Sequence, residues 1–152
     1  MRASTLLTGD LVQSIGTLGE ALAADASSGK RPDFGMRIEG RPRPLAPLLR
    51  DEVYRIAGEA LHNAFRHAPA VRIEVDLRYD PHWFRLRVRD DGRGIDPAML
   101  DRGRAGHYGL AGMRERATLL GGTLAVWSEL DSGTEAELTV PASVAYGKAN
   151  AC

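Results

Sequence analysis

The sequence lacks three features that would each have indicated a class of protein. It holds one cysteine, Cys152, so an intrachain disulfide and a cysteine-rich metal site are both excluded. No apolar run approaches the roughly 20 residues that span a bilayer, and the first ten residues are too weakly apolar for a secretory signal. Twenty basic and twenty acidic residues give a formal net charge of +0, which argues against bulk electrostatic binding to nucleic acid or to an anionic membrane.

The composition favours a single globular domain. The 152 residues are 43% apolar and 26% charged, which is enough apolar material for one core and a normal value for a soluble surface. The single cysteine fits a reducing compartment. We therefore expect a cytoplasmic setting, either for a free protein or for the cytoplasmic part of a longer, membrane-anchored one.

Hydrophobic periodicity predicts both helices and strands. Apolar residues at three- and four-residue steps predict helices over 7–24, 46–67 and 110–120. Alternating runs predict five short strands, at 34–39, 71–77, 84–88, 123–127 and 135–140. A mixed, mostly antiparallel sheet with one solvent face, covered by helices on the other, is an α+β fold built as a two-layer α/β sandwich.

Three segments follow from this pattern. Residues 31–141 contain the predicted sheet and are expected to form the globular domain. Residues 1–30 hold a helix followed by a small-residue linker. Residues 142–152 lack periodicity and are expected to form a flexible tail.

The helix over 46–67 carries a row of polar groups. Glu59, Asn63 and either Arg66 or His67 share one face, because they are spaced at i, i+4 and i+7 or i+8. Polar groups beside a packed apolar face are costly unless they bind something, and this set suits phosphates and a hydrated Mg²⁺. The alternative is a solvated helix edge with ordinary i,i+4 pairs.

Two glycine-rich segments follow. Asp90 to Ile95 comes directly after a strand, where glycines let a backbone approach a ligand and Asp90 can accept a hydrogen bond from an amine such as that of adenine. Gly106 to Met113 runs from a glycine-rich loop into a helix, whose N-terminus suits phosphate. It is not a Walker A loop, since no Gly-Lys-Ser/Thr follows. The alternatives are a plain turn and a helix-capping loop.

A fourth cluster, Ser132-Gly133-Thr134-Glu135, is typical of a hairpin turn, in which Thr134 can donate a hydroxyl hydrogen bond at the start of a strand.

The order of the four clusters resembles that of the ATPase family shared by histidine kinases, gyrase B subunits, Hsp90 chaperones and MutL. The resemblance covers about residues 33–141. The sequence segments 59–68 and 109–117 are similar to those of sensor histidine kinases of the class that partners helix-turn-helix (LuxR-type) response regulators.

The resemblance implies a Bergerat fold that binds ATP and Mg²⁺. Asn63 would coordinate Mg²⁺, and Glu59 would act as general base or polarise the attacking imidazole. Asp90 would bind the adenine amine, and residues 96–108 would form the ATP lid. The ATP-binding residues carried over are Asn63, Arg66, His67, Asp90, Gly92, Gly94, Ile95, Gly106, His107, Gly109, Leu110 and Thr134.

The same resemblance implies the partners. The γ-phosphoryl group would pass to a histidine on a separate dimerisation domain and then to an aspartate of a response regulator receiver domain. Residues 1–30 would be a remnant of that dimerisation domain. The chain's own histidines lack the setting of a phosphoacceptor; they are His62, His67, His82 and His107.

Three other functions fit parts of the pattern. A gyrase- or chaperone-like machine needs transducer domains that 152 residues cannot hold. A free-standing anti-sigma-type serine kinase of the same superfamily is of suitable size. A non-catalytic nucleotide-binding regulatory module would keep the fold and lose ATP chemistry.

Overall fold

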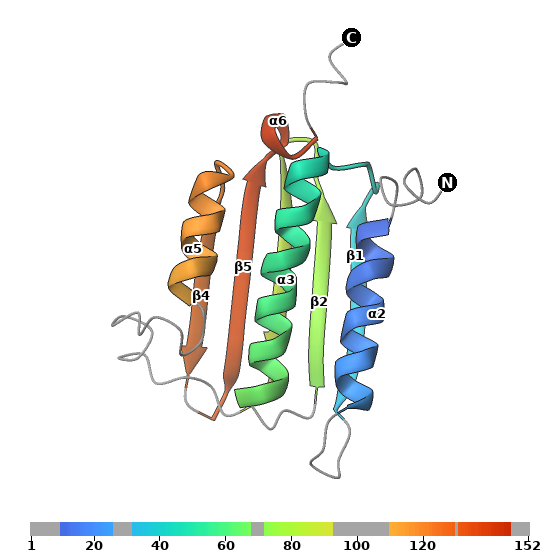
Figure 1. Cartoon of the computed structure of the whole chain (residues 1–152), viewed down its shortest axis with the longest axis vertical. Coiled ribbons are helices and arrows are strands. Elements are labelled where there is room, and N and C mark those ends of the chain that lie inside the picture. The colour runs from blue at the N-terminus through green and yellow to red at the C-terminus, as the bar shows by residue number, and fades with distance from the viewer. Residues whose placement is uncertain (1–9, 26–31, 68–71, 93–109, 130, 147–152) are drawn as a thin grey trace.

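The computed structural model describes residues 10–25, 32–67, 72–92, 110–129 and 131–146. Figure 1 shows one sheet with helices in front of it. In chain order the elements are α2 (Asp10–Ala24), β1 (Asp33–Gly40), α3 (Pro47–His67), β2 (Arg72–Tyr79), β3 (Trp83–Asp90), α5 (Leu110–Leu119), β4 (Thr123–Glu129), β5 (Gly133–Pro141) and α6 (Ala142–Ala145).

The sheet has five strands in the order β1-β2-β3-β5-β4. β1 pairs with β2 in parallel, and the other three pairs are antiparallel. α2, α3 and α5 cover one face of it (Figure 1), with α2 against β1, α3 against β3 and α5 against β4. The predicted α+β two-layer sandwich with a mixed, mostly antiparallel sheet is confirmed. None of the helices among the described residues is both long and apolar enough to cross a membrane.

The alternation along the central strands separates the core from the open face of the sheet. Ile73, Val75 and Leu77 of β2 are buried under the helices. The alternate residues of β2, Glu74 and Asp76, form ion pairs with arginines of β3. The Asp76 carboxylate accepts a hydrogen bond from Arg87 at 2.8 Å, and the Glu74 carboxylate accepts one from Arg89 at 2.8 Å. Opposite charges directly across a strand pair stabilise the sheet, so the open face is polar and its charges are largely paired.

α2 packs into the same core as the sheet. Ile15 is 0% exposed, and the helix contacts both α3 and β1. Gly19 faces the ring of Phe34, and a Cβ at that position would lie only 2.1 Å from Phe34 Cζ. The apolar stripe that predicts this helix therefore packs on the core of the domain.

The chain does not become loose at residue 142, which corrects the expected tail boundary. Residues 142–145 form α6, and Tyr146 is 5% exposed. The Tyr146 hydroxyl donates to the Asp80 carbonyl at 3.1 Å, and the guanidinium of Arg43 lies over its ring at 3.8 Å. A four-residue helix is too short to show a period, which is why the pattern missed it. Residues 147–152 of the predicted tail lie outside the described residues.

Candidate functional site

The predicted site elements meet at one end of the molecule. α3 ends there, α5 begins there, and β4 and β5 are joined there (Figure 1). The register places the end of β3 at the same end, because Asp90 pairs with Ile73 of β2 and with Thr134 of β5. Residues that are up to 75 positions apart in the sequence are thereby brought to the same end of the domain.

Asp90 is held at the end of β3 by neighbouring backbone amides. Its Oδ1 accepts from the Gly92 amide at 2.9 Å. Burial raises the pKa of Asp90, and backbone hydrogen bonds from Gly92 and Thr134 oppose that rise without cancelling it. A partly buried carboxylate gains most from a further N–H donor, so the position suits an amino group on a ligand.

The start of β5 comes very close to Asp90. Gly133 has φ +100°, and a Cβ on it would lie 2.0 Å from the Asp90 carbonyl oxygen, so glycine is required here. Ser128 of β4 lies opposite Thr134, with 2.9 Å between the two hydroxyl oxygens, and donates to the Gly133 carbonyl at 3.1 Å. Sequence reasoning missed Ser128, because only strand pairing brings it to Thr134.

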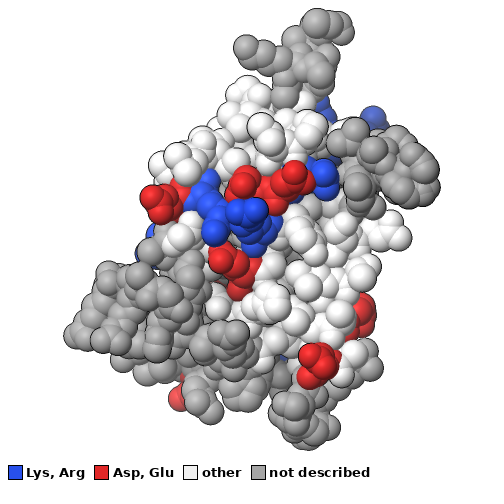
Figure 2. All heavy atoms as spheres, in the orientation of Figure 1, with Lys and Arg blue, Asp and Glu red and all other residues white. Residues whose placement is uncertain are grey.

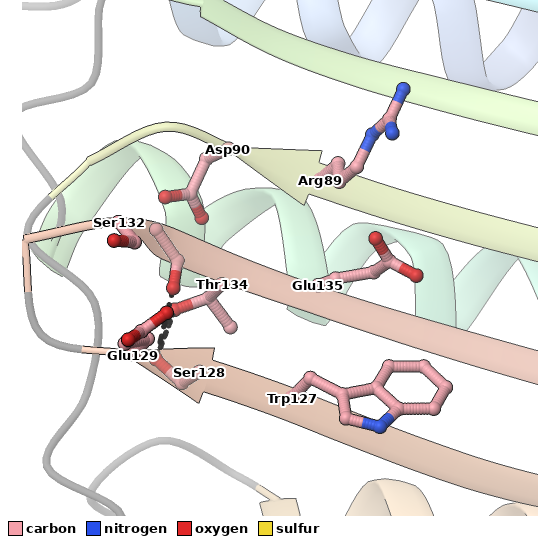
Figure 3. A pocket seen from close by; sticks show the side chains of 9 residues that line it. Arg89, Asp90, Trp127, Ser128, Glu129, Ser132, Thr134 and Glu135 are labelled. Carbon is pink, nitrogen blue, oxygen red and sulfur yellow. Dashed lines mark hydrogen bonds between the residues drawn. The ribbon is translucent and has the colours of Figure 1, made fainter.

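A cavity of about 480 Å³ opens at this end of the sheet. It includes two of the predicted adenine contacts, Asp90 and Thr134, which Figure 3 shows at adjoining strand ends. Its lining residues are Arg89, Asp90, Trp127, Ser128, Glu129, Ser132, Gly133, Thr134 and Glu135. Glu59 and Asn63 do not line it, and Arg89, which pairs with Glu74, lies on the open face of the sheet, so the cavity does not join Asp90 to α3.

The polar face of α3 lies at the border of the core. Glu59 and Asn63 are partly exposed, while their neighbours Ala60, Leu61 and Ala64 are buried. Glu59 Oε1 accepts from Nη1 of Arg116 on α5 at 2.7 Å. This partner lies on another helix, 57 positions further along the chain.

Several predicted residues lie outside the described part. Arg66 and His67 belong to the last turn of α3, and Leu110 is the first residue of α5, but their side chains are not described. The others lie wholly outside the described residues, together with the predicted lid 96–108; they are Gly94, Ile95, Gly106, His107 and Gly109.

The donor set on α3 fits Mg²⁺ held mainly by phosphate. Within the described ranges, no group of three or more His, Cys, Asp or Glu side chains could hold a metal ion. Mg²⁺ bound with a nucleotide needs no such cage, since it takes one or two protein oxygens and completes its shell with phosphate and water. The amide oxygen of Asn63, partly exposed on α3, is a suitable ligand of that kind.

The sheet is covered by helices on one face and carries the partly buried Asp90 carboxylate at a strand end, at the end of the domain where α3 also ends. Residues 49–144 match the family described as histidine kinase-, DNA gyrase B-, and HSP90-like ATPase, and the chain belongs to this family. The expected family and its ATP-binding fold are thereby confirmed.

The curated relatives are sensor kinases. The chain is 40% identical over 93 residues to the sensor histidine kinase LiaS of Bacillus subtilis (strain 168), with 61% of this chain and 25% of LiaS covered. It is 36% identical over 93 residues to the sensor protein VraS of Staphylococcus haemolyticus (strain JCSC1435), with 61% and 26% covered. It is 32% identical over 106 residues to the signal transduction histidine-protein kinase/phosphatase DegS of Bacillus subtilis (strain 168), with 70% and 28% covered. The chain spans about a quarter of the length of these relatives.

Proposed function

We propose that the chain is the ATP-binding catalytic domain of a two-component sensor histidine kinase. It binds MgATP and transfers the γ-phosphoryl group to a histidine on a separate dimerisation domain, which then phosphorylates an aspartate of a response regulator of the helix-turn-helix class. One observation carries the proposal: the polar end of α3, the end of β3 and the start of α5 lie at one end of the domain (Figure 1). Membership of the ATPase family and the names of the relatives support it.

Adenine binds at the strand ends. The Asp90 carboxylate accepts from the exocyclic amine, and Thr134, one strand away, contributes through a water. Gly92 is buried against this position. Gly94 and Ile95 shape the rest of the pocket.

The phosphates lie between α3 and α5. Asn63, phosphate oxygens and water hold Mg²⁺, which neutralises charge on the phosphates. Arg66 and His67 contact phosphate or ribose. The amides of residues 106–109, His107 included, hold phosphate oxygens, and the N-terminus of α5 at Leu110 adds a partial positive charge.

Transfer needs positioning more than covalent help from the protein. One imidazole nitrogen of the acceptor histidine attacks the γ-phosphorus in line. The bond to the bridging oxygen breaks, and ADP leaves with its electron pair. Glu59 accepts a hydrogen bond from the other imidazole nitrogen and either takes its proton or polarises the ring.

A titration of labelled ATP with and without Mg²⁺ tests the binding step. We expect saturable binding that Mg²⁺ strengthens, and we expect Asn63→Ala to lose the Mg²⁺-dependent part while it unfolds at the same temperature as the unmodified chain. His62→Ala is the matched control, because His62 is the preceding residue of α3 and is exposed. Absence of saturable binding would instead favour a non-catalytic module. If Asn63→Ala binds MgATP like the control, the metal assignment is wrong.

The phosphoryl acceptor is tested separately. The chain is incubated with labelled ATP and either the dimerisation domain of the kinase or a purified anti-sigma antagonist. Acid-labile, base-stable label on the dimerisation domain supports the proposal. Acid-stable label on the antagonist alone would identify a serine kinase.

A further inference from the structure

A single arginine joins the two helices of the proposed site. Arg116 lies on α5, and its Nη1 contacts Glu59 Oε1 of α3 at 2.7 Å. Its Nε lies 3.9 Å from Oε1 of Glu52, two turns earlier on α3. In the part of the chain that the structure describes, both ion pairs between α3 and α5 use this guanidinium. Figure 2 shows acidic and basic side chains gathered over these two helices on an otherwise largely uncharged face.

The bridge is anchored and partly withdrawn from water. Met113 and Ala117 of α5 are buried against the core, so the helix that carries Arg116 is fixed on the domain. The side chains of Arg116 and Glu59 are 30% and 38% exposed. A half-buried pair on packed helices is screened less and costs less side-chain ordering than a fully exposed one.

The bridge constrains the carboxylate to which the proposed function assigns the imidazole. A glutamate side chain has several rotamers, and fixing one of them costs free energy that the bridge supplies in advance. The bridge uses Oε1 of Glu59, so the bridge itself does not occupy Oε2, the oxygen that would accept a second hydrogen bond. We infer that Arg116 is a positioning residue, which holds Glu59 in the orientation needed to receive the imidazole N–H of the acceptor histidine. This inference rests on the proposed function.

The same contact ties Glu59 to the helix that follows the predicted lid. α5 begins at Leu110, two positions after residue 108, where the predicted lid ends, and Arg116 lies less than two turns further along it. A shift of α5 would therefore move Arg116 and release Glu59. The expected signature is a loss of transfer rate with little loss of nucleotide affinity, since Arg116 is not assigned to adenine, phosphate or metal.

The test uses Arg116→Gln, Arg116→Lys and the matched control Arg114→Gln, which removes an arginine two residues earlier on α5. MgATP affinity and unfolding temperature are measured on the chain, and the rate of phosphohistidine formation on the full-length kinase that contains it. We expect Arg116→Gln to lower the rate at saturating ATP about tenfold or more, with MgATP affinity within about twofold of the unmodified chain. Arg116→Lys should recover most of the rate, because an ammonium can reach one carboxylate oxygen, and Arg114→Gln should match the unmodified kinase.

A double variant shows whether Arg116 acts through Glu59. If it does, Arg116→Gln adds little to the loss caused by Glu59→Gln. Additive losses would overturn the inference, as would an Arg116→Gln rate equal to that of Arg114→Gln. A parallel loss of MgATP affinity and thermal stability would also overturn it, because Arg116 would then be a structural residue. If the unmodified kinase forms no phosphohistidine, the proposed function itself is wrong.

Discussion

Replacement of Asp90 by asparagine should weaken ATP binding strongly. The carboxylate already accepts from the amides of Gly92 and Thr134. In Asp90→Asn the amide oxygen satisfies those donors, and the new NH₂ group is left to face the adenine amine, so one hydrogen bond to a charged group is replaced by two opposed donors. A hydrogen bond to a charged group contributes about 1.5–3 kcal/mol, which corresponds to a loss of affinity of roughly 10- to 100-fold.

The same substitution should stabilise the nucleotide-free domain at neutral pH. Burial raises the pKa of Asp90 above its ordinary value of 3.8, so the folded state keeps the proton to higher pH than the unfolded chain does. The contribution of Asp90 to stability is therefore most favourable below the unfolded pKa and is lost as the pH rises through the folded pKa. At pH 7 the full cost of the buried charge is present, and Asp90→Asn removes it.

Thermal unfolding with and without MgATP measures both effects. Without nucleotide, Asp90→Asn should unfold at a higher temperature than the unmodified chain at pH 7, and the difference should shrink at pH values below the raised pKa. With MgATP, the unmodified chain should gain more stability than the variant. A variant that is less stable at pH 7 without nucleotide, or that binds ATP as the unmodified chain does, would refute the role given to the buried carboxylate.

Three further substitutions test the packing of the domain, one of them beside Asp90. Gly133→Ala should lower the free energy of unfolding by about 2 kcal/mol or more and weaken ATP binding, because φ is +100° and the added Cβ meets the Asp90 carbonyl. An unchanged denaturant unfolding curve would contradict the close approach of Gly133 to Asp90. Gly58→Ala, in the middle of α3, should instead stabilise the domain by up to about 1 kcal/mol, since the nearest atom, Leu18 Cδ2, is 3.5 Å from the added Cβ. A lower unfolding temperature would show that the packing around Gly58 does not admit a methyl group. Tyr146→Phe should lower the free energy of unfolding by about 1 kcal/mol, or the unfolding temperature by a few degrees, because it removes the hydrogen bond to the Asp80 carbonyl. The control Tyr54→Phe, on the exposed surface of α3, should change stability little, and equal effects would contradict the role of the Tyr146 hydroxyl.

The sequence predicts secondary structure well where a periodic pattern of apolar residues extends over many positions. The stripes over 7–24 and 46–67 predict α2 and α3 within a few residues, and alternation predicts the β2–β3 hairpin. A stripe shows that a helix buries one face, but it does not show which surface it packs against. The stripe over 7–24 therefore predicts α2 but does not predict that Ile15 lies in the core of the domain.

For the candidate site too, the sequence predicts local features but not contacts between distant residues. The spacing of Glu59 and Asn63 predicts a shared helical face, and the order of the motifs indicates the family. The contacts that hold the site are non-local: Ser128 reaches Thr134 through strand register, and Arg116 reaches Glu59 across 57 positions. No local pattern encodes such pairs, so they had to be found in the structure.

Amide chemical-shift mapping with MgATP tests the central claim most directly. ¹⁵N-labelled chain is titrated with MgATP, and the shifts of assigned amides are followed. We predict that the saturable shifts cluster at the end of α3, at Asp90 and Gly92, at Gly133 and Thr134 and at the start of α5, while the opposite end around Tyr146 stays unchanged. Saturable shifts confined to the open face of the sheet or to the end around Tyr146 would contradict a nucleotide site between α3 and the strand ends.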